Sequence, residues 1–192
     1  MTRNILIVQG HPDAAPERFC RALATAYGEA AEASGHAVRR IDLATLSFDL
    51  LRTKVEHDHG PVPAAIAPLQ DAIAWADHIV FVFPLWLGGM PAMLKGFLEQ
   101  VLRPGFAYEV ESGWKRLLTG RSARIIVTMG MPALAYRFWF GGHGVRQLER
   151  SILRFVGIAP VSTTLIGRIE AMDDKQRIRW LERMRDLGRG AR

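Results

Sequence analysis

The chain has 192 residues, 49% of them apolar, which suffices for one domain with a sizeable core and argues against disorder. It carries 25 Lys and Arg against 19 Asp and Glu, and the net charge of +6 is compatible with nucleic acid, a membrane surface or an anionic small molecule as partner. The single cysteine, Cys20, excludes an internal disulfide, and no CxxC or His/Cys metal spacing occurs. We therefore expect a protein of the reducing cytoplasm without a bound metal.

Neither a membrane segment nor a nucleic-acid motif stands out in the sequence. No apolar run approaches the roughly 20 residues that cross a bilayer, and the apolar stretch before Gly10 is too short for a signal peptide. Many arginines fall in residues 173–192, where Trp180, Met184 and Leu187 recur at helical spacing, which favours a solvated helix face. We expect no membrane insertion and no nucleic-acid partner.

Apolar runs alternate with amphipathic stretches along the whole chain. The apolar runs predict five strands, at residues 4–10, 37–43, 78–84, 123–130 and 160–167. The amphipathic stretches predict helices at residues 17–35, 64–76, 91–102 and 145–157, and a last helix within 173–192. Residues 56–60, EHDHG, are expected in a solvated loop that does not bind a metal. The alternation is typical of a parallel sheet with crossover helices in a single domain, residues 1–192.

Three of the predicted strands, the first, third and fourth, run directly into loops that contain Gly and Pro. These loops read QGHPDAAP, FPLWLGGMP and TMGMPALAY. Ligands of open parallel sheets bind outside the carboxyl ends of the strands at the topological switch point, which in the order 2-1-3-4-5 lies between the first and third strands. We therefore expect a flavodoxin-like, doubly wound, five-stranded α/β sheet of this order, with helices on both faces and all three loops at one crevice.

The first two loops contain groups suited to opposite ends of a nucleotide-like ligand. The first precedes a helix whose opening amides can receive a phosphate, and His11 and Arg18 could add donors. In the second, Gly88 and Gly89 leave room for a flat heteroaromatic ring over the backbone, and Trp86 could cover it. Each loop also has a purely structural interpretation, as a Pro-shaped helix entry and as a tight turn with the Trp in the core.

The third loop adds groups that could act on a bound redox ring. Thr128 offers a hydroxyl, Gly130 allows close approach, and Tyr136 and His143 follow a few residues later. A phenol and an imidazole can stabilise negative charge that develops when a ring accepts hydride. Taken singly, Tyr136 is more often a packing residue and His143 a surface residue.

Together these segments resemble the flavodoxin-like NAD(P)H:quinone oxidoreductases, the family that includes DT-diaphorase and the modulator-of-drug-activity-B proteins. The resemblance covers nearly the whole chain and rests on ILIVQGHP, FPLWLGGMPAMLKGFLEQVLRPGFAY, TMGMPALAY with GGHG after it, and ILRFVGIAPVSTTLIG. It implies that the second loop holds the isoalloxazine ring of a flavin. Phe106 and Tyr108 match residues that line the substrate pocket, commonly across a dimer interface, so we expect a homodimer.

The resemblance also implies roles for individual residues in the three loops. His11, Arg18 and Phe19 match the region of the flavin phosphate, and Tyr136 and His143 match a catalytic pair beside the flavin. The residues that match the surroundings of the flavin ring are Pro84, Leu85, Trp86, Leu87, Gly88, Thr128, Met129, Gly130 and Met131.

The chain departs from the family pattern in three places. Pro16 and Arg18 stand where many relatives have a Ser or Thr and an Asn, which changes the expected phosphate contacts. Leu87 stands where relatives usually carry an aromatic, which predicts weaker stacking on the substrate side. The match of His143 requires a shift of one residue relative to Tyr136.

The resemblance implies a reductase in which NAD(P)H and the acceptor use one pocket in turn. NAD(P)H passes a hydride to the flavin and leaves, and a quinone or similar electrophile then takes two electrons, which is a ping-pong scheme. Chain length and the C-terminal segment resemble those of the FAD-using members more than those of the shortest FMN-binding ones, which favours FAD, with FMN possible. The basic charge favours NADPH over NADH. The alternative is a flavin-binding regulatory or electron-transfer partner, of the kind that serves potassium-efflux systems, with the basic C-terminal helix as docking face.

Overall fold

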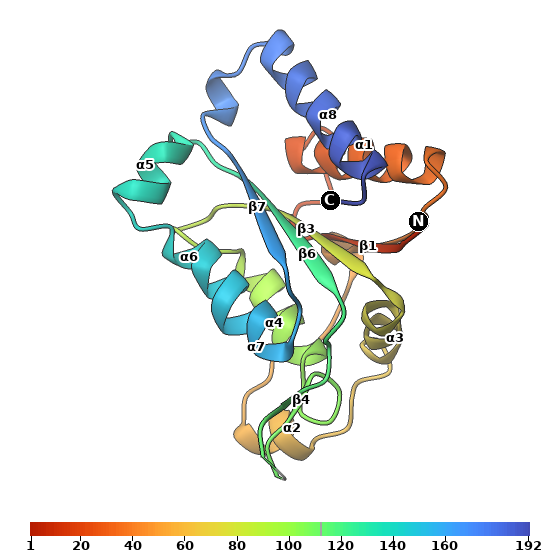
Figure 1. Cartoon of the computed structure of the whole chain (residues 1–192). Coiled ribbons are helices and arrows are strands. Elements are labelled where there is room, and N and C mark those ends of the chain that lie inside the picture. Colours follow the sequence, from red (N-terminus) through yellow and green to blue (C-terminus); the bar gives the residue numbers. More distant parts are fainter. Residues whose placement is uncertain (112) are drawn as a thin grey trace.

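The computed structural model describes residues 1–111 and 113–192, and a parallel sheet forms the middle layer of the domain (Figure 1). The order of its five strands is β2-β1-β3-β6-β7. The strand bounds are Asn4–Gln9 for β1, Ala37–Asp42 for β2, His78–Pro84 for β3, Ser122–Thr128 for β6 and Val161–Ile166 for β7. Since β6 and β7 are the fourth and fifth strands of this sheet, the predicted order 2-1-3-4-5 is confirmed.

Helices cover both faces of the sheet, as the sequence predicts (Figure 1). On one face α1, Phe19–Ala33, packs against α8, Asp174–Arg189. The opposite face is covered by α3, Ala67–Trp75, by α4, Ala92–Val101, and by the consecutive segments α6, His143–Arg146, η2, Gln147–Leu153, and α7, Arg154–Val156. The sequence predicts one helix over residues 145–157, and the structure has π-helical turns in the η2 part of this region.

The central strands β1 and β3 are buried along nearly their whole length because helices cover both of their faces. Every residue of β3 is buried, and so is every residue of β1 except Asn4. Continuous burial of this kind is typical of parallel strands between two helical layers. The edge strand β2 differs, since it exposes Arg39 and Arg40.

Several short elements lie in segments that the sequence analysis treats as loops. Residues 56–60, expected in a solvated loop, fall largely within the helix α2, Lys54–His59. This helix begins where the Thr53 side chain accepts a hydrogen bond from the backbone N–H of Glu56, a favourable N-cap. The other additions are η1, Leu43–Thr45, the hairpin of β4, Tyr108–Glu109, and β5, Lys115–Arg116, then α5, Ala133–Phe138, and η3, Ile169–Ala171.

The five strands run in one direction, so their carboxyl ends share one end of the sheet. The loops after β1, β3 and β6 leave from this carboxyl end, and α5 lies beside it (Figure 1). Helix α2 and the β4–β5 hairpin lie at the opposite, amino end. Of the helices in the described part of the chain, none is both long enough and apolar enough to cross a membrane.

Candidate active site

The segment after β3 forms a tight turn with an open outer surface. Trp86 and Gly89 exchange two backbone hydrogen bonds of 2.9 Å, and Leu87 and Gly88 between them have φ angles of 46° and 79°. Two consecutive positive φ angles are typical of a type I′ turn, in which Asn-Gly is the usual pair. Among the described residues, no neighbouring atom lies within 4 Å of a Cβ placed on Gly88 or Gly89. A planar ring can therefore approach the backbone of this turn.

The inner side of the same turn rests on α5 and α6. The Tyr136 hydroxyl donates to the Gly88 carbonyl at 3.1 Å and accepts from the backbone N–H of Val145, also at 3.1 Å. A Cβ on Gly144 would lie 2.2 Å from the Gly88 carbonyl oxygen, so only a glycine fits there. Tyr136 is buried, and its hydroxyl holds the turn in place. Gly144 is not among the site residues predicted from the sequence, although the GGHG segment could have indicated it.

His143 lies on the surface near Tyr136, at the first position of α6. Its ring folds back over Gly141, since a Cβ on that glycine would lie 2.5 Å from His143 Nε2. Within the described residues, no hydrogen bond joins His143 to Tyr136. The two predicted catalytic residues therefore differ in this structure. Tyr136 is buried and hydrogen-bonded to the turn, whereas the imidazole of His143 is exposed.

The loop after β1 is organised around a carboxylate. One Asp13 oxygen accepts from the Ala15 N–H at 2.8 Å, and the other pairs with the Arg18 guanidinium at 2.6 Å. The N–H of Asp13 donates to His11 Nδ1 at 3.0 Å. The Ala15 N–H, followed by Arg18, lowers the pKa of Asp13, whereas burial lowers the pKa of His11. The Asp13 carboxylate thus already engages donors of this loop that an anion could otherwise use.

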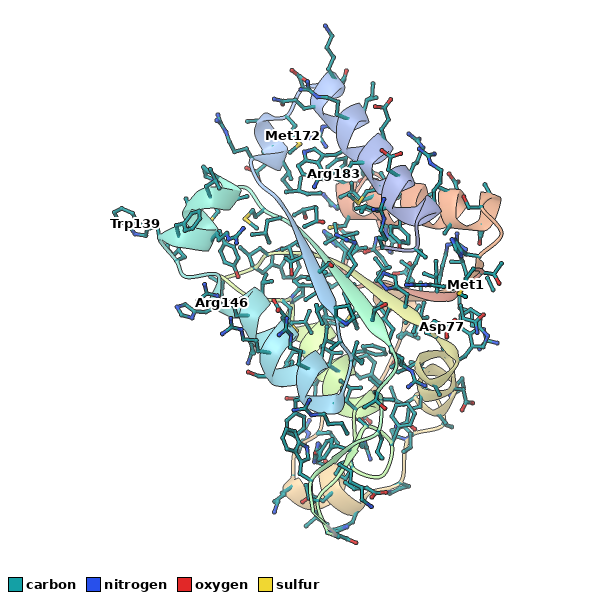
Figure 2. All side chains as sticks on the ribbon, viewed as in Figure 1. Met1, Asp77, Trp139, Arg146, Met172 and Arg183 are labelled. Carbon is teal, nitrogen blue, oxygen red and sulfur yellow. The ribbon has the colours of Figure 1, made fainter. Side chains whose placement is uncertain are left out.

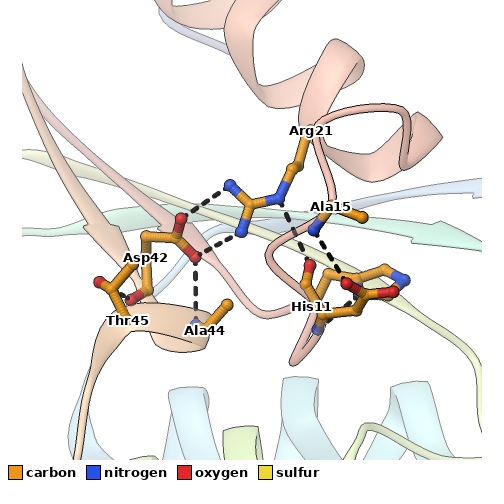
Figure 3. Close-up of polar contacts among 7 residues, drawn as sticks. His11, Ala15, Arg21, Asp42, Ala44 and Thr45 are labelled. Carbon is orange, nitrogen blue, oxygen red and sulfur yellow. Dashed lines mark hydrogen bonds and ion pairs between the residues drawn. The ribbon is translucent and has the colours of Figure 1, made fainter.

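Arg21, a residue to which the sequence analysis gave no role, fixes this loop against the end of β2 (Figure 3). Its guanidinium donates to both carboxylate oxygens of Asp42, at 2.7 and 3.0 Å, and to the Asp13 carbonyl at 3.4 Å. Asp42 also accepts from the Ala44 N–H at 3.1 Å. Helix α1 itself starts without a side-chain cap, so its first amides are available to a phosphate.

The loop after β6 does not present the predicted Thr128 hydroxyl to the crevice. Thr128 is buried, and its hydroxyl lies 3.1 Å from the Cys20 thiol. Strand alternation places Thr128 on the same face as Ile126, against α1, so its side chain cannot donate to a ligand in the crevice. Burial raises the pKa of Cys20 to about 11, which makes the thiol unreactive. Gly130 is exposed beside the Glu170 carboxylate.

Comparison with known proteins places the fold and the site in a family. Residues 3–187 match the family described as "Flavodoxin-like fold". The chain belongs to the flavodoxin-like family. A Haemophilus influenzae protein named as an NAD(P)H oxidoreductase is 32% identical over 184 residues, which cover 93% of this chain and 91% of the relative. The expected family, that of the flavodoxin-like NAD(P)H oxidoreductases, is confirmed, and the chain is an oxidoreductase.

Two further comparisons extend this result. Rat NAD(P)H dehydrogenase [quinone] 1 is 27% identical, over 94% of this chain and 74% of the rat protein. The crystal structure of an FMN-dependent NADH-azoreductase from Bacillus anthracis in complex with FMN superimposes with a TM-score of 0.81 over 100% of this chain and 99% of that one. At 15% identity, this second likeness concerns the fold alone.

The flavodoxin-like fold brings most of the predicted site residues to the carboxyl end of the sheet, at different depths. The exposed ones are Arg18, Trp86, Leu87, Gly88, Gly130 and His143. The half-buried ones are His11, Phe19, Leu85 and Met131. The buried ones are Pro84, Thr128, Met129 and Tyr136.

Two predicted substrate-pocket residues lie elsewhere in this flavodoxin-like chain. Tyr108 is in the β4–β5 hairpin and packs edge to face on Phe155, with ring centroids 5.1 Å apart. Phe106 lies just before β4. Both are at the amino end of the sheet, so one chain alone does not bring them to the crevice.

A groove near the site could hold part of a cofactor, whereas the described residues form no metal site. A groove of about 510 Å³ between η3 and α8 is lined in part by Arg168, Arg179, Arg183 and Trp180. It lies near the start of α1, since Phe19 packs in the same core cluster as Trp180. In the segments that the structure describes, no group of three or more His, Cys, Asp or Glu residues is placed to hold a metal.

Proposed function

We propose that this oxidoreductase binds a flavin at the carboxyl end of the sheet and transfers two electrons as a hydride from NAD(P)H to a quinone or a similar electrophilic acceptor. The open turn at Gly88 and Gly89 carries the proposal, because a flat ring can lie against it. The names of the rat quinone dehydrogenase and the Bacillus azoreductase support the same class of reaction. A bound flavin would supply the hydride chemistry, and the protein would orient and shield it.

The ring would rest on the turn from Pro84 to Gly88 and on the backbone of residues 128–131. Trp86 and His11 support this orientation, since their rings meet edge to face with centroids 6.0 Å apart and would together form one wall beside the ring. Leu87 at the exposed tip of the turn would contact the acceptor. We propose that NAD(P)H and the acceptor bind there in turn, and parallel lines in steady-state kinetics would support this ping-pong scheme.

We propose different tasks for the two predicted catalytic residues. His143, an exposed imidazole, would stabilise negative charge on the reduced ring. Tyr136 would be a positioning residue, because its hydroxyl is already bonded to the Gly88 carbonyl. His143→Gln should slow reduction by NADPH and leave flavin affinity unchanged, whereas Tyr136→Phe should weaken flavin affinity. The reverse pattern would contradict this division.

The flavin phosphate would bind at the start of α1. Its uncapped amides and the Arg18 guanidinium fit an anion. Asp13 now accepts from Arg18, so a phosphate would have to take this donor from the carboxylate. Asp13→Asn, which frees Arg18, should therefore not weaken flavin binding.

We propose FMN as the cofactor, although the chain length and C-terminal segment favour FAD. The structure of the Bacillus azoreductase, which contains FMN, supports this choice. One observation favours FAD as the second candidate: the arginine-lined groove beside α8 has room for a second phosphate and a base. NADPH in preference to NADH and a cytoplasmic location are also proposals, from the basic charge and the single cysteine.

We also propose a homodimer in which the hairpin of each copy reaches the crevice of the other. The position of Tyr108 at the amino end, away from the crevice of its own chain, supports this arrangement. Tyr108→Ala should raise KM for a quinone and leave flavin affinity unchanged. A monomer in sedimentation velocity would contradict the proposal.

Anaerobic addition of NADPH to the flavin-loaded protein, followed by a soluble quinone, tests the reductase function. We expect the flavin absorption to bleach with NADPH and return with quinone, with no other protein present. A flavin that NADPH does not reduce would favour the alternative, a regulatory or electron-transfer partner that acts by binding another protein.

A further inference from the structure

The arginine-lined groove between η3 and α8 holds guanidinium groups that no other part of the chain engages. Arg168, Arg179 and Arg183 line this volume of about 510 Å³, and within the described residues their side chains form neither a hydrogen bond nor an ion pair. No Asp or Glu is among the described residues that line the groove. The carboxylate of Glu170, on η3, lies instead beside Gly130. Guanidinium groups without a carboxylate partner suit phosphate groups.

An aromatic ring and an amide lie among these guanidinium groups. The Arg183 Cζ atom is 5.4 Å from the centroid of the half-buried Trp180 ring. Gln176 Oε1 accepts from the backbone N–H of Asp173, which leaves the Gln176 amide N–H groups for a ligand. In Figure 2, Met172 after η3 and Arg183 on α8 mark two sides of the groove. Flat bases stack on tryptophan and on guanidinium planes, so the groove fits a phosphorylated nucleoside.

The groove adjoins the loop on which the flavin ring is proposed to lie. The backbone N–H of Arg168 donates to the Met131 carbonyl at 3.2 Å. A Cβ on Gly167 would lie 2.4 Å from the Ala133 backbone nitrogen, so only a glycine fits this close approach. Because residues 128–131 would support the ring, a ligand that begins over the ring can continue into the groove.

The backbone of Arg168 is held in a conformation that glycine adopts more easily. Its φ of 57° lies in the left-handed region, where a residue with a side chain is strained. Strain of this kind is typical of functional sites. An arginine at such a position indicates that its guanidinium has a task in the groove.

Two ligands of the proposed reaction carry a phosphorylated adenosine, FAD and NADPH. The tail of FAD would extend from the phosphate site at the start of α1, but residues 167–183 alone line the groove. NADPH also carries more phosphate than FAD, because its adenosine ribose has a 2′-phosphate besides the diphosphate. With FMN as the flavin, the groove is free for the co-substrate.

We propose that the groove binds the adenosine half of NADPH while the nicotinamide lies on the flavin ring. Arg168, Arg179 and Arg183 then select NADPH over NADH, because arginine is the residue that accommodates a 2′-phosphate. NADH would leave these guanidinium groups without part of their ligand. The inference rests on the proposed function, with FMN as the flavin.

Calorimetric titration of the purified full chain with 2′,5′-ADP, the adenosine half of NADPH without nicotinamide, tests the proposal. We expect 2′,5′-ADP to bind about tenfold or more tightly than 5′-AMP, which lacks the 2′-phosphate. The double variant Arg179→Gln/Arg183→Gln should bind 2′,5′-ADP about tenfold or more weakly. It should raise KM for NADPH by a similar factor and leave kcat, KM for NADH and FMN affinity unchanged.

Two further variants separate the groove from general effects of charge and folding. Arg185→Gln is the matched control, because Arg185 is exposed on the same helix but lines a different hollow, beside α1. It should bind 2′,5′-ADP like the unaltered chain. Arg168→Gly removes a guanidinium and keeps the positive φ. It should weaken 2′,5′-ADP binding without lowering the melting temperature.

The same titrations contain the results that would overturn the proposal. Failure of 2′,5′-ADP to bind, or equal binding by the Arg179→Gln/Arg183→Gln variant, would remove NADPH from the groove. A variant that loses affinity for FAD and keeps its KM for NADPH would assign the groove to a flavin tail instead. Binding of 2′,5′-ADP that depends on these arginines, in a chain without reductase activity, would contradict the proposed function and support the adenosine phosphate site.

Discussion

The two ends of the sheet belong to the same five strands, yet they differ in how their polar groups are satisfied. At the amino end, Arg103 and Arg121 each donate to three backbone carbonyls, and His78 is hydrogen-bonded to Ser122 at 2.7 Å. The exceptions in these side chains are Arg103 Nε and His78 Nε2, which are buried without a partner among the described residues. At the carboxyl end, α1 starts without a side-chain cap, Leu87 has a positive φ, and Phe138 and Trp139 face solvent.

This difference indicates that stability and binding depend on opposite ends of the molecule. Groups that are internally satisfied lower the free energy of the folded state, whereas open amides and strained turns are typical of sites that await a ligand. Substitutions at the amino end should therefore lower the free energy of unfolding and spare flavin affinity. Substitutions at the carboxyl end should lower flavin affinity without lowering the free energy of unfolding.

The largest loss of stability is expected for Arg103→Met. Arg103 is 4% exposed, and its guanidinium donates to the carbonyls of Glu56, Gly60 and Pro61. Without these donors the free energy of unfolding should fall by about 3 kcal/mol, measured by urea denaturation, while FMN affinity stays unchanged. Arg52→Met is the matched control, because it makes the same change at an exposed residue just before α2, the helix that Arg103 contacts. It should alter neither the free energy of unfolding nor FMN affinity. A selective loss of FMN affinity in Arg103→Met would contradict the comparison.

Acid should destabilise the protein through His78. Burial, with Arg124 and Arg3 nearby, lowers the pKa of His78 to about 4. Because protonation then favours the unfolded chain, stability that is complete above pH 6.5 is lost as the pH falls toward 4, by about 3 kcal/mol at most. His78→Gln should flatten the plot of unfolding free energy against pH in this window. An equally steep plot for the variant would assign the effect to other groups.

Gly89→Ala should separate binding from stability at the carboxyl end. A Cβ on Gly89 meets no atom within 4 Å among the described residues, and Gly89 does not have a positive φ, so the free energy of unfolding should stay within about 0.5 kcal/mol. The same methyl group would occupy the surface on which the ring is proposed to lie. FMN affinity, measured by fluorescence titration, should therefore drop about tenfold or more. Unchanged affinity would remove the turn from the site.

The smallest effect, a gain in stability, is expected for Leu87→Asn. A leucine with a φ of 46° is strained, and Asn followed by Gly is the preferred pair in a type I′ turn. The free energy of unfolding should rise by about 1 kcal/mol. Leu134→Asn, which also removes an exposed leucine but from a helix, should give no gain. A loss of stability in Leu87→Asn would show that the turn is unstrained.

The strand order could be predicted from the sequence because each buried strand appears as a separate apolar run, HIVFVFP being the clearest. Helix α2 could not, since its six residues, five of them polar, gain their stability from a cap and from distant bonds, such as that of Arg103 to the Glu56 carbonyl. The β4–β5 hairpin was missed because each of its strands has two residues.

The parts of the candidate site that depend on the backbone could be predicted from the sequence. The parts that depend on the direction of a side chain could not. Two adjacent glycines identified the open turn directly. The burial of Thr128 depends on which strand face α1 covers, and the brace role of Tyr136 depends on Gly88, 48 residues earlier in the chain. Such contacts between distant segments leave no local pattern in the sequence.

The identity of the chromophore released by heating the purified protein tests the central claim most directly. We expect a yellow protein that releases a flavin with the mass of FMN, one per chain, and that takes FMN up again after removal. Release of FAD would leave the carboxyl-end site intact and assign the arginine-lined groove to its second half. A colourless protein that also fails to bind added FMN or FAD would contradict the claim that the three loops form a flavin site.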